Sequence, residues 1–316
     1  MIRMCVFFLS VLLGFIIGGC HPKSTNSSLS VVGGVENWSS YPSAIAIFFF
    51  DSQKNPTLEC TGVFISDSHV LTAAHCIRGS LSKPAAYATI YDSADGPLTA
   101  KKLVSSTFAV FPGYVMGDTS GASLGSDIAI ITFPKNSVAA GYVARLSSMS
   151  PVTKDRVYMV GYGRTKISSV NNNPDFKRYT GSNEVATIIK NSSDAVLTVS
   201  LVPGPETAGV AKGDSGGPLF NSKGEIVGIT KGNGSISGYY VDDPIINTYP
   251  KSSLFSFFIN VNNPKVRAFI QSVVPQTGSS QKTPSQSGVQ TSQPSETNSV
   301  QLPTNSGSKP LQTDFS

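Results

Sequence analysis

The sequence predicts an all-β globule that ends in one helix and a polar tail. Charged residues make up only 14% of the 316 residues, and 29 residues are glycine. Short apolar runs rich in Val, Ile and Phe alternate with turn residues, whereas long runs with the 3.6-residue period of a helix are rare. Such spacing is typical of a β-sandwich or of β-barrels.

Short apolar runs mark the expected strands, and one amphipathic segment marks the expected helix. In Pro264–Val274, the apolar residues fall at helical spacing behind a proline, which is favoured in the first turn of a helix. The expected strands are Ala44–Phe50, Cys60–Ile65, Val70–Ala73, Ala129–Phe133, Val157–Val160, Val196–Val202 and Ile226–Thr230.

Residues 1–19 predict a targeting segment. Arg3 supplies a positive charge, and Cys5–Ile17 is an apolar run of signal-peptide length that is too short to cross a membrane comfortably. The run ends in Ile-Gly-Gly-Cys20, which resembles a bacterial lipobox, in which the cysteine is lipidated and becomes the first residue. The alternative is an ordinary secretory signal with an incidental cysteine. We expect an exported bacterial lipoprotein, attached through Cys20 in the periplasm, at the outer membrane or at the cell surface.

Two polar segments flank the expected globule of residues 31–275. Residues 20–30 lack any period and predict a linker or a propeptide. From residue 276 to residue 316 the chain is rich in Ser, Thr, Gln and Pro. Such a segment cannot bury enough apolar surface to offset the entropy lost on ordering, so we expect it to be disordered.

The cysteines and the net charge narrow the class of protein. Of the four cysteines, Cys5 lies in the signal and Cys20 would carry the lipid. An isolated pair in an exported chain predicts one disulfide, between Cys60 and Cys76. The net charge of +5 comes without a block of Lys or Arg, which argues against nucleic acid as a partner.

The stretch GDSGGP, Gly213–Pro218, poses the question of a nucleophile. Its residue types are also those of an ordinary turn, and a serine hydroxyl reacts only beside a base. The chain has three histidines. His21 precedes the globule, and His69 lies in an expected exposed turn. His75 follows a buried-looking strand and adjoins Cys76; taken alone, it would more often be structural.

The chain resembles the chymotrypsin/trypsin family of serine endopeptidases. The motifs occur in the family's order across residues 31–275, with the signal and the tail outside the resemblance. CTGVFISDSHVLTAAHC, Cys60–Cys76, matches the disulfide-closed segment that ends in T-A-A-H-C, and Gly213–Pro218 matches the nucleophile motif. Ser126–Ile130 is similar to the D-I-A-L strand, Gly161–Gly163 to the G-W-G turn and Val31–Gly34 to the I-V-G-G start of the mature enzyme.

The resemblance implies two Greek-key β-barrels, at residues 31–150 and 151–263, with the active site between them. His75 would take the proton of Ser215 as general base, and Asp127 would orient and stabilise the imidazole. The order His, Asp, Ser is that of the chymotrypsin template rather than that of subtilisin or the α/β-hydrolases. The alternative for Asp127 is a surface carboxylate before a buried strand.

The resemblance also assigns roles to the main chain around Ser215. The backbone N–H groups of Gly213 and Ser215 would form the oxyanion hole. Asp214 would pair with the α-amine of Val31 once a zymogen is cut there. The resemblance implies protein or peptide substrates, no metal or organic cofactor, and a monomer.

Three departures from the family pattern affect activation and specificity. Ser30, rather than Arg or Lys, precedes Val31, so activation by a trypsin-like enzyme is not expected. Gly209 stands where members that prefer Arg or Lys carry Asp, which predicts that tryptic specificity is absent. Thr230-Lys231-Gly232 replaces the family's S-W-G. Lys212 at the rim of the substrate pocket either favours acidic groups or is simply solvated. We expect a small or apolar side chain on the substrate residue whose carbonyl is attacked.

Two classes of function compete at this point. One is an exported serine endopeptidase that works through an acyl-enzyme, and the other is a catalytically silent homologue used as a surface binding protein. Silent homologues usually lose a member of the triad. Because His75, Asp127 and Ser215 are all retained, the sequence favours the enzyme.

Overall fold

The computed structural model describes the central part of the chain, and every described residue belongs to one compact unit within residues 1–275. The predictions for the signal, for Cys20 and for the tail concern residues outside the described ranges. Those ranges are 31–50, 56–78, 85–90, 101–105, 107–115, 125–164, 177–189, 195–199, 207–235, 245–250 and 253–275.

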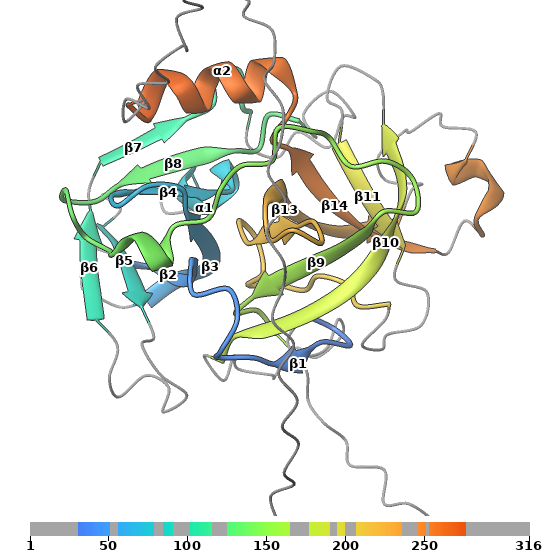
Figure 1. Ribbon diagram of the computed structural model, residues 1–316, viewed down its shortest axis with the longest axis horizontal. Coiled ribbons are helices and arrows are strands. Elements are labelled where there is room, and N and C mark those ends of the chain that lie inside the picture. Colours follow the sequence, from blue (N-terminus) through green and yellow to red (C-terminus); the bar gives the residue numbers. More distant parts are fainter. Residues whose placement is uncertain are drawn as a thin grey trace, which may run out of the picture. The chain divides into compact units, whose positions relative to one another are not determined.

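The first sheet is formed by the N-terminal half of the described chain. Its strands pair antiparallel in the order β6-β5-β2-β3-β4-β8-β7 (Figure 1). The strands are β2 (Ala44–Phe50), β3 (Pro56–Phe64), β4 (His69–Thr72), β5 (Ala85–Ile90), β6 (Lys101–Ser105), β7 (Thr107–Val110) and β8 (Ala129–Thr132).

The second sheet closes on itself. Its order is β1-β10-β11-β14-β13-β12-β9, and β9 also pairs with β10. This additional pairing closes the six strands from β9 through β14 into a barrel, with β1 paired to β10 outside the closed ring. The strands are β1 (Val35–Glu36), β9 (Arg156–Gly161), β10 (Tyr179–Ile189), β11 (Ala195–Val199), β12 (Pro218–Phe220), β13 (Ile226–Ser235) and β14 (Leu254–Asn260). The two sheets and the C-terminal helix confirm the predicted fold class.

The start of the described chain lies with the second barrel, although it precedes the strands of the first. Val35 pairs with Thr180 of β10, and Val32 forms an isolated bridge with Gly209. Val31 is fully buried in the apolar interior of the second barrel. The sequence range 31–150 therefore contains a first segment that pairs with the second sheet.

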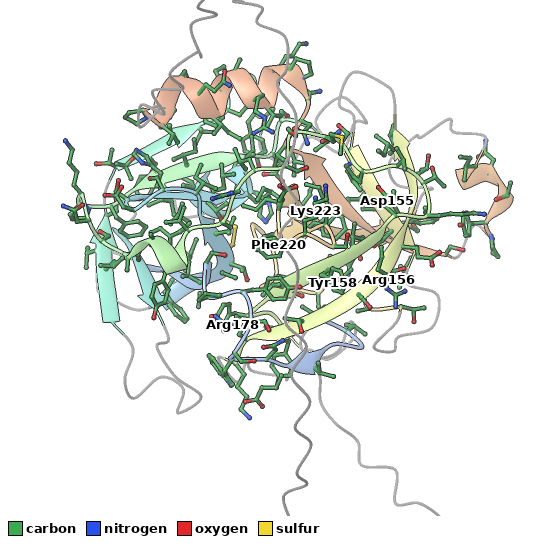
Figure 2. The ribbon with its side chains drawn as sticks, viewed as in Figure 1. Asp155, Arg156, Tyr158, Arg178, Phe220 and Lys223 are labelled. Atoms are coloured by element: carbon green, nitrogen blue, oxygen red, sulfur yellow. A yellow bond between two sulfur atoms is a disulfide. The ribbon has the colours of Figure 1, made fainter. Side chains whose placement is uncertain are left out.

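Apolar residues from both sheets share one core. Leu71 and Ile130 of the first sheet lie in the same cluster as Phe220 and Ile229 of the second. Figure 2 labels Phe220 on β12 and its cross-strand partner Tyr158 on β9. Because this cluster joins the sheets, their relative position is fixed by buried apolar contacts.

Two α-helices and two short 3-10 turns, Ala140–Tyr142 and Ile246–Thr248, accompany the described strands. Helix α1 (Ala74–Arg78) follows β4 directly, and α2 (Pro264–Val273) closes the described chain. The side chain of Asn263 accepts hydrogen bonds from the first N–H groups of α2, and Pro264 lacks the N–H that would have needed a partner. Within the described ranges, no helix has the length and apolar character needed to span a membrane.

Candidate active site

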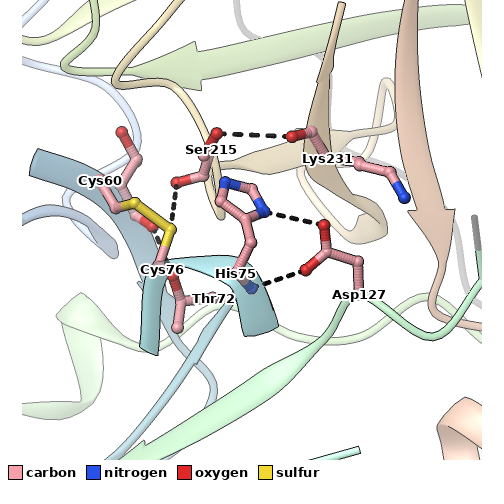
Figure 3. Close-up of polar contacts among 8 residues, drawn as sticks. Cys60, Thr72, His75, Cys76, Asp127, Ser215 and Lys231 are labelled. Atoms are coloured by element: carbon pink, nitrogen blue, oxygen red, sulfur yellow. Dashed lines mark hydrogen bonds and ion pairs between the residues drawn. A yellow bond between two sulfur atoms is a disulfide. The ribbon is translucent and has the colours of Figure 1, made fainter. Parts of the chain in front are cut away.

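The register of β4 and β8 brings His75 to Asp127. The strands are antiparallel, and Thr72 at the end of β4 pairs with Ala129 at the start of β8. The residues just after β4 therefore lie beside those just before β8. Both oxygens of Asp127 are used: Oδ2 lies 2.8 Å from His75 Nδ1, and Oδ1 accepts the backbone N–H of His75 at 2.8 Å (Figure 3).

This pairing fixes the electrostatics of the Asp127 carboxylate. The group is 2% exposed. Burial opposes its ionisation, but the hydrogen bond from the His75 ring, the charges of His75 and Lys231, and the His75 backbone N–H together hold its pKa below the usual value. An ionised acceptor at Nδ1 selects the tautomer with its proton there, which leaves Nε2 able to accept a proton.

Ser215 comes from the second sheet, in the loop before β12. Its hydroxyl donates to the Lys231 carbonyl oxygen at 3.4 Å. Within the described residues, this carbonyl, and not the His75 ring, is its hydrogen-bond partner. The Ser215 carbonyl oxygen lies 3.8 Å from Sγ of Cys76, the residue after His75; a disulfide sulfur carries no proton, so this is a contact and not a hydrogen bond. The loop thus lies against α1, with the hydroxyl turned to β13.

Thr61 of β3 ties the Ser215 loop to the first sheet. Its backbone N–H donates to the Ser215 carbonyl at 2.8 Å, and its hydroxyl donates to the Gly213 carbonyl at 2.9 Å. The sequence analysis did not single out Thr61. Its place directly after Cys60, inside the segment that matches the family, was the available signal.

Asp214 is fully buried beneath the same loop. Its Oδ1 accepts the N–H of Gly163 at 2.9 Å, Oδ2 accepts the N–H of Ala211 at 2.8 Å, and the backbone N–H of Val31 donates to it as well. Burial nevertheless raises the pKa of Asp214 to about 7. The carboxyl group also explains Gly161, because a Cβ there would lie 2.0 Å from Oδ1 of Asp214.

The backbone is unusual at two of the predicted functional positions. Gly213 has φ of +101°, and a Cβ on it would lie 2.6 Å from the Cα of Gly163. Both observations require glycine there. Val31 has φ of +46°, which is strained for a β-branched residue.

The predicted pocket residues divide into two groups. Thr230 and Lys231 adjoin the Ser215 loop. The Thr230 carbonyl accepts the N–H of Gly216, the Thr230 N–H donates to the Gly217 carbonyl, and the backbone carbonyl of Lys231 accepts the Ser215 hydroxyl. Gly232 follows them in β13. Gly209 instead donates its N–H to the Val32 carbonyl at 2.9 Å, and Lys212 is exposed.

The disulfide between Cys60 and Cys76 is confirmed and joins β3 to α1. Both sulfurs and a ring nitrogen of His75 lie within 4.8 Å of one another, but both sulfurs are committed to the disulfide. The prediction of an exposed turn at His69 is wrong. This residue begins β4, is half-buried, and lies with Nδ1 2.8 Å from the hydroxyl of Ser66.

The fold is that of the trypsin-like serine peptidases. Residues 33–247 match the family model of trypsin, and the chain belongs to that family. It is therefore a serine-type peptidase, with protein or peptide substrates.

Two solved structures share the fold at low sequence identity. Neuropsin, a serine protease expressed in the limbic system of mouse brain, is 19% identical with a TM-score of 0.55; the match covers 77% of this chain and 99% of neuropsin. A protein named GrC is 17% identical with a TM-score of 0.54, over 77% of this chain and 98% of its own. A comparison with curated proteins finds no match.

Proposed function

We propose that the chain is an exported bacterial serine endopeptidase that cleaves peptide bonds with His75, Asp127 and Ser215. The observation that carries the proposal is the pairing of Asp127 with both the ring and the backbone N–H of His75, 2.8 Å each, beside the Ser215 loop. An orienting carboxylate on one side of an imidazole and a serine on the other are what acyl transfer requires.

In the reaction, substrate binding turns the Ser215 hydroxyl from the Lys231 carbonyl toward His75. The Ser215 oxygen attacks the scissile carbonyl carbon while Nε2 of His75 takes its proton. The imidazolium then gives this proton to the leaving amine, and the acyl-enzyme remains on Ser215. Water, deprotonated by His75, hydrolyses the ester, and the proton returns to Ser215. Asp127 stays ionised throughout and stabilises the imidazolium.

The oxyanion is held by the backbone N–H groups of Gly213 and Ser215. Removal of one donor from such a hole costs about 3–4 kcal/mol of transition-state stabilisation in comparable enzymes. The carbonyls of these two residues accept the hydrogen bonds of Thr61, which fixes the loop from its other side and leaves the N–H groups for the substrate.

The activation step depends on the charge that faces the buried Asp214 carboxyl. In the uncut chain, this buried carboxyl receives the neutral peptide N–H of Val31. A cut between Ser30 and Val31 would place an α-ammonium group at the same position and supply the missing positive charge. It would also remove the strained peptide link at Val31. Ser30 before the cut points to an activating protease without tryptic specificity.

The proposed location is the bacterial envelope. Cys20 would carry a lipid that holds the precursor at a membrane, and the cut after Ser30 would release a monomeric catalytic domain. Position 209 carries glycine, whereas family members that prefer Arg or Lys carry Asp there, which supports a substrate specificity other than for Arg or Lys.

The test is labelling with a fluorophosphonate probe, which reacts with an activated serine. The chain that begins at Val31, the chain that begins at Cys20 and the Ser215→Ala variant of the first are compared. We expect labelling of the Val31 form alone, abolished by Ser215→Ala. Equal labelling of both forms would keep the enzyme and remove the activation step. Absence of labelling in both folded forms would favour the silent surface-binding homologue.

A further inference from the structure

A row of polar side chains crosses the interior of the second barrel, where apolar residues are the rule. Thr198 of β11 pairs with Ser256 of β14, and Ser256 pairs with Asn233 of β13. Cross-strand partners in an antiparallel sheet lie on the same face. Ser256 is two residues from Phe258, which packs in the interior cluster, so the row shares the interior face.

This row is bonded to the segment that leads into the nucleophile loop. Ser256 Oγ accepts the N–H of Val210 at 3.0 Å, and Nδ2 of Asn233 donates to the carbonyl of Val210 at 2.7 Å. The loop with Ser215 follows five residues later. The polar row and the nucleophile are therefore held by one short stretch of chain.

Thr230 extends the row toward Ser215. It is the cross-strand partner of Phe258 and so faces the same interior. Its backbone N–H donates to the Gly217 carbonyl, and its carbonyl accepts the N–H of Gly216, each at 2.8 Å. Gly216 and Gly217 are the two residues that follow Ser215 in the sequence. Thr230 thus lies between the polar row and the nucleophile loop.

Among the described residues, the hydroxyl groups of Thr230 and Thr198 are buried without a hydrogen-bond partner. The two residues are 1% and 0% exposed. Such groups are uncommon and unfavourable, because burial removes their water without replacing it. A water molecule is the simplest partner for either hydroxyl. Thr230, however, adjoins the place where a substrate must bind.

The geometry of acylation places a substrate side chain next to Thr230. The carbonyl carbon that Ser215 attacks must approach its hydroxyl, which points to the Lys231 carbonyl in β13. The side chain of that substrate residue then enters along β13. On the interior face of that stretch, β13 presents Thr230 and Asn233, the cross-strand partners of Phe258 and Ser256.

We propose that Thr230 and Asn233 select an uncharged amide side chain, Gln or Asn, on the substrate residue whose carbonyl is attacked. The proposal rests on the proposed peptidase function. A hydroxyl and a carboxamide both donate and accept hydrogen bonds, so each satisfies the other. Asn233 is half-buried and lies at the solvent end of the row.

A charged side chain fits this face less well than an amide. Thr198, Thr230, Asn233 and Ser256 are all neutral, and a buried charge without an opposite charge is strongly unfavourable. The positive charge of Lys231 acts on Asp127. An amide side chain at this substrate position differs from the small or apolar side chain that the sequence analysis expected there.

The test uses the chain that begins at Val31 and continues to the C-terminus. It is assayed with three fluorogenic peptides that differ only in the residue before the cleaved bond. Gln is compared with Met, which has similar length without the amide, and with Glu, which adds a charge. We expect kcat/KM for Gln to exceed that for Met and for Glu by about tenfold or more. Thr230→Val should lower the Gln-to-Met ratio by about three- to tenfold, the share of one neutral hydrogen bond.

Two variants separate selection from packing. Thr230→Ser keeps the hydroxyl and should keep the Gln-to-Met ratio, and Thr132→Val in β8 of the first sheet should leave the ratio unchanged. A wild-type enzyme that cleaves after Met as well as after Gln would overturn the inference. So would a Thr230→Val variant that loses activity equally on both peptides. If Ser215 fails to react with fluorophosphonate, the proposed peptidase itself is wrong and the selection falls with it; labelling without amide preference refutes the selection alone.

Discussion

Asp214 should make the uncut chain less stable as the pH rises from about 4 to about 7. Folding raises its pKa from 3.8 to about 7 because full burial outweighs the N–H groups of Ala211, Gly163 and Val31. In this interval the unfolded chain has released the proton while the folded chain still holds it, so a rise in pH favours unfolding. A shift of about three pH units corresponds to about 4 kcal/mol of lost stability.

A cut before Val31 should remove this loss. The new α-ammonium favours the ionised form of Asp214 and lowers its pKa, so the cut chain gains stability over the uncut chain up to pH 7, by a maximum of about 4 kcal/mol. The amine makes its own contribution fully below its unfolded pKa of about 8, and loses it as the pH rises through the higher folded value. The comparison therefore ends at pH 7.

The assay is urea unfolding of the uncut and cut chains from pH 4 to pH 7, both carrying Ser215→Ala to prevent self-cleavage. Fluorescence of Trp38, the single tryptophan of the sequence, reports unfolding. Because both chains share every other carboxyl group of the globule, the difference between their stabilities isolates Asp214 and Val31. Parallel curves for the two chains would refute the reasoning.

Three further substitutions test the site and its supports. Asp127→Asn should lower kcat by about 10⁴ with the fold intact, because His75 loses the correct tautomer; a loss under tenfold in a peptide assay would contradict this role. Replacement of Cys60 and Cys76 by Ala opens a loop with a separation of 16 residues and should lower the free energy of unfolding by about 3 kcal/mol in urea. Gly213→Ala puts a Cβ against Gly163 at a positive φ and should destabilise the fold by at least about 1–3 kcal/mol while abolishing probe labelling; an unchanged urea midpoint would speak against the described loop.

Strands with apolar sequences were predictable, and strands with buried polar residues were not. AIAIFFF in β2 and the capped amphipathic α2 carry strong local signals, and both segments form as expected. β10 reads YTGSNEVATII and lacks a period. Several of its polar residues are buried; Asn183, for example, donates from Nδ2 to the Ala208 carbonyl 2.8 Å away, and the Thr180 hydroxyl accepts from Nδ2 of Asn37. Such partners are absent from any local pattern.

Only those residues of the candidate site that belong to recognisable sequence motifs were predictable. His75 and Asp127 are 52 residues apart, and only the resemblance to a known family placed them together before the register of β4 and β8 did so. One of the two hydrogen bonds from Thr61 comes from its hydroxyl. The other one, and the hydrogen bond to the Lys231 carbonyl, involve main-chain groups. Every residue type has a backbone carbonyl and all but proline have a backbone N–H, so the sequence gives little sign of such contacts.

The hydrogen bonds from Thr61 mean that the position of the nucleophile loop depends on both sheets. Ser215 is encoded with the second sheet, yet its carbonyl and that of Gly213 are held by a strand of the first. A chimaera that joined one sheet of this chain to the other sheet of a relative would therefore have to carry a matched pair, the threonine in β3 and the glycine-serine loop that it holds. Recombination between the sheets is limited by these two hydrogen bonds as well as by the apolar core.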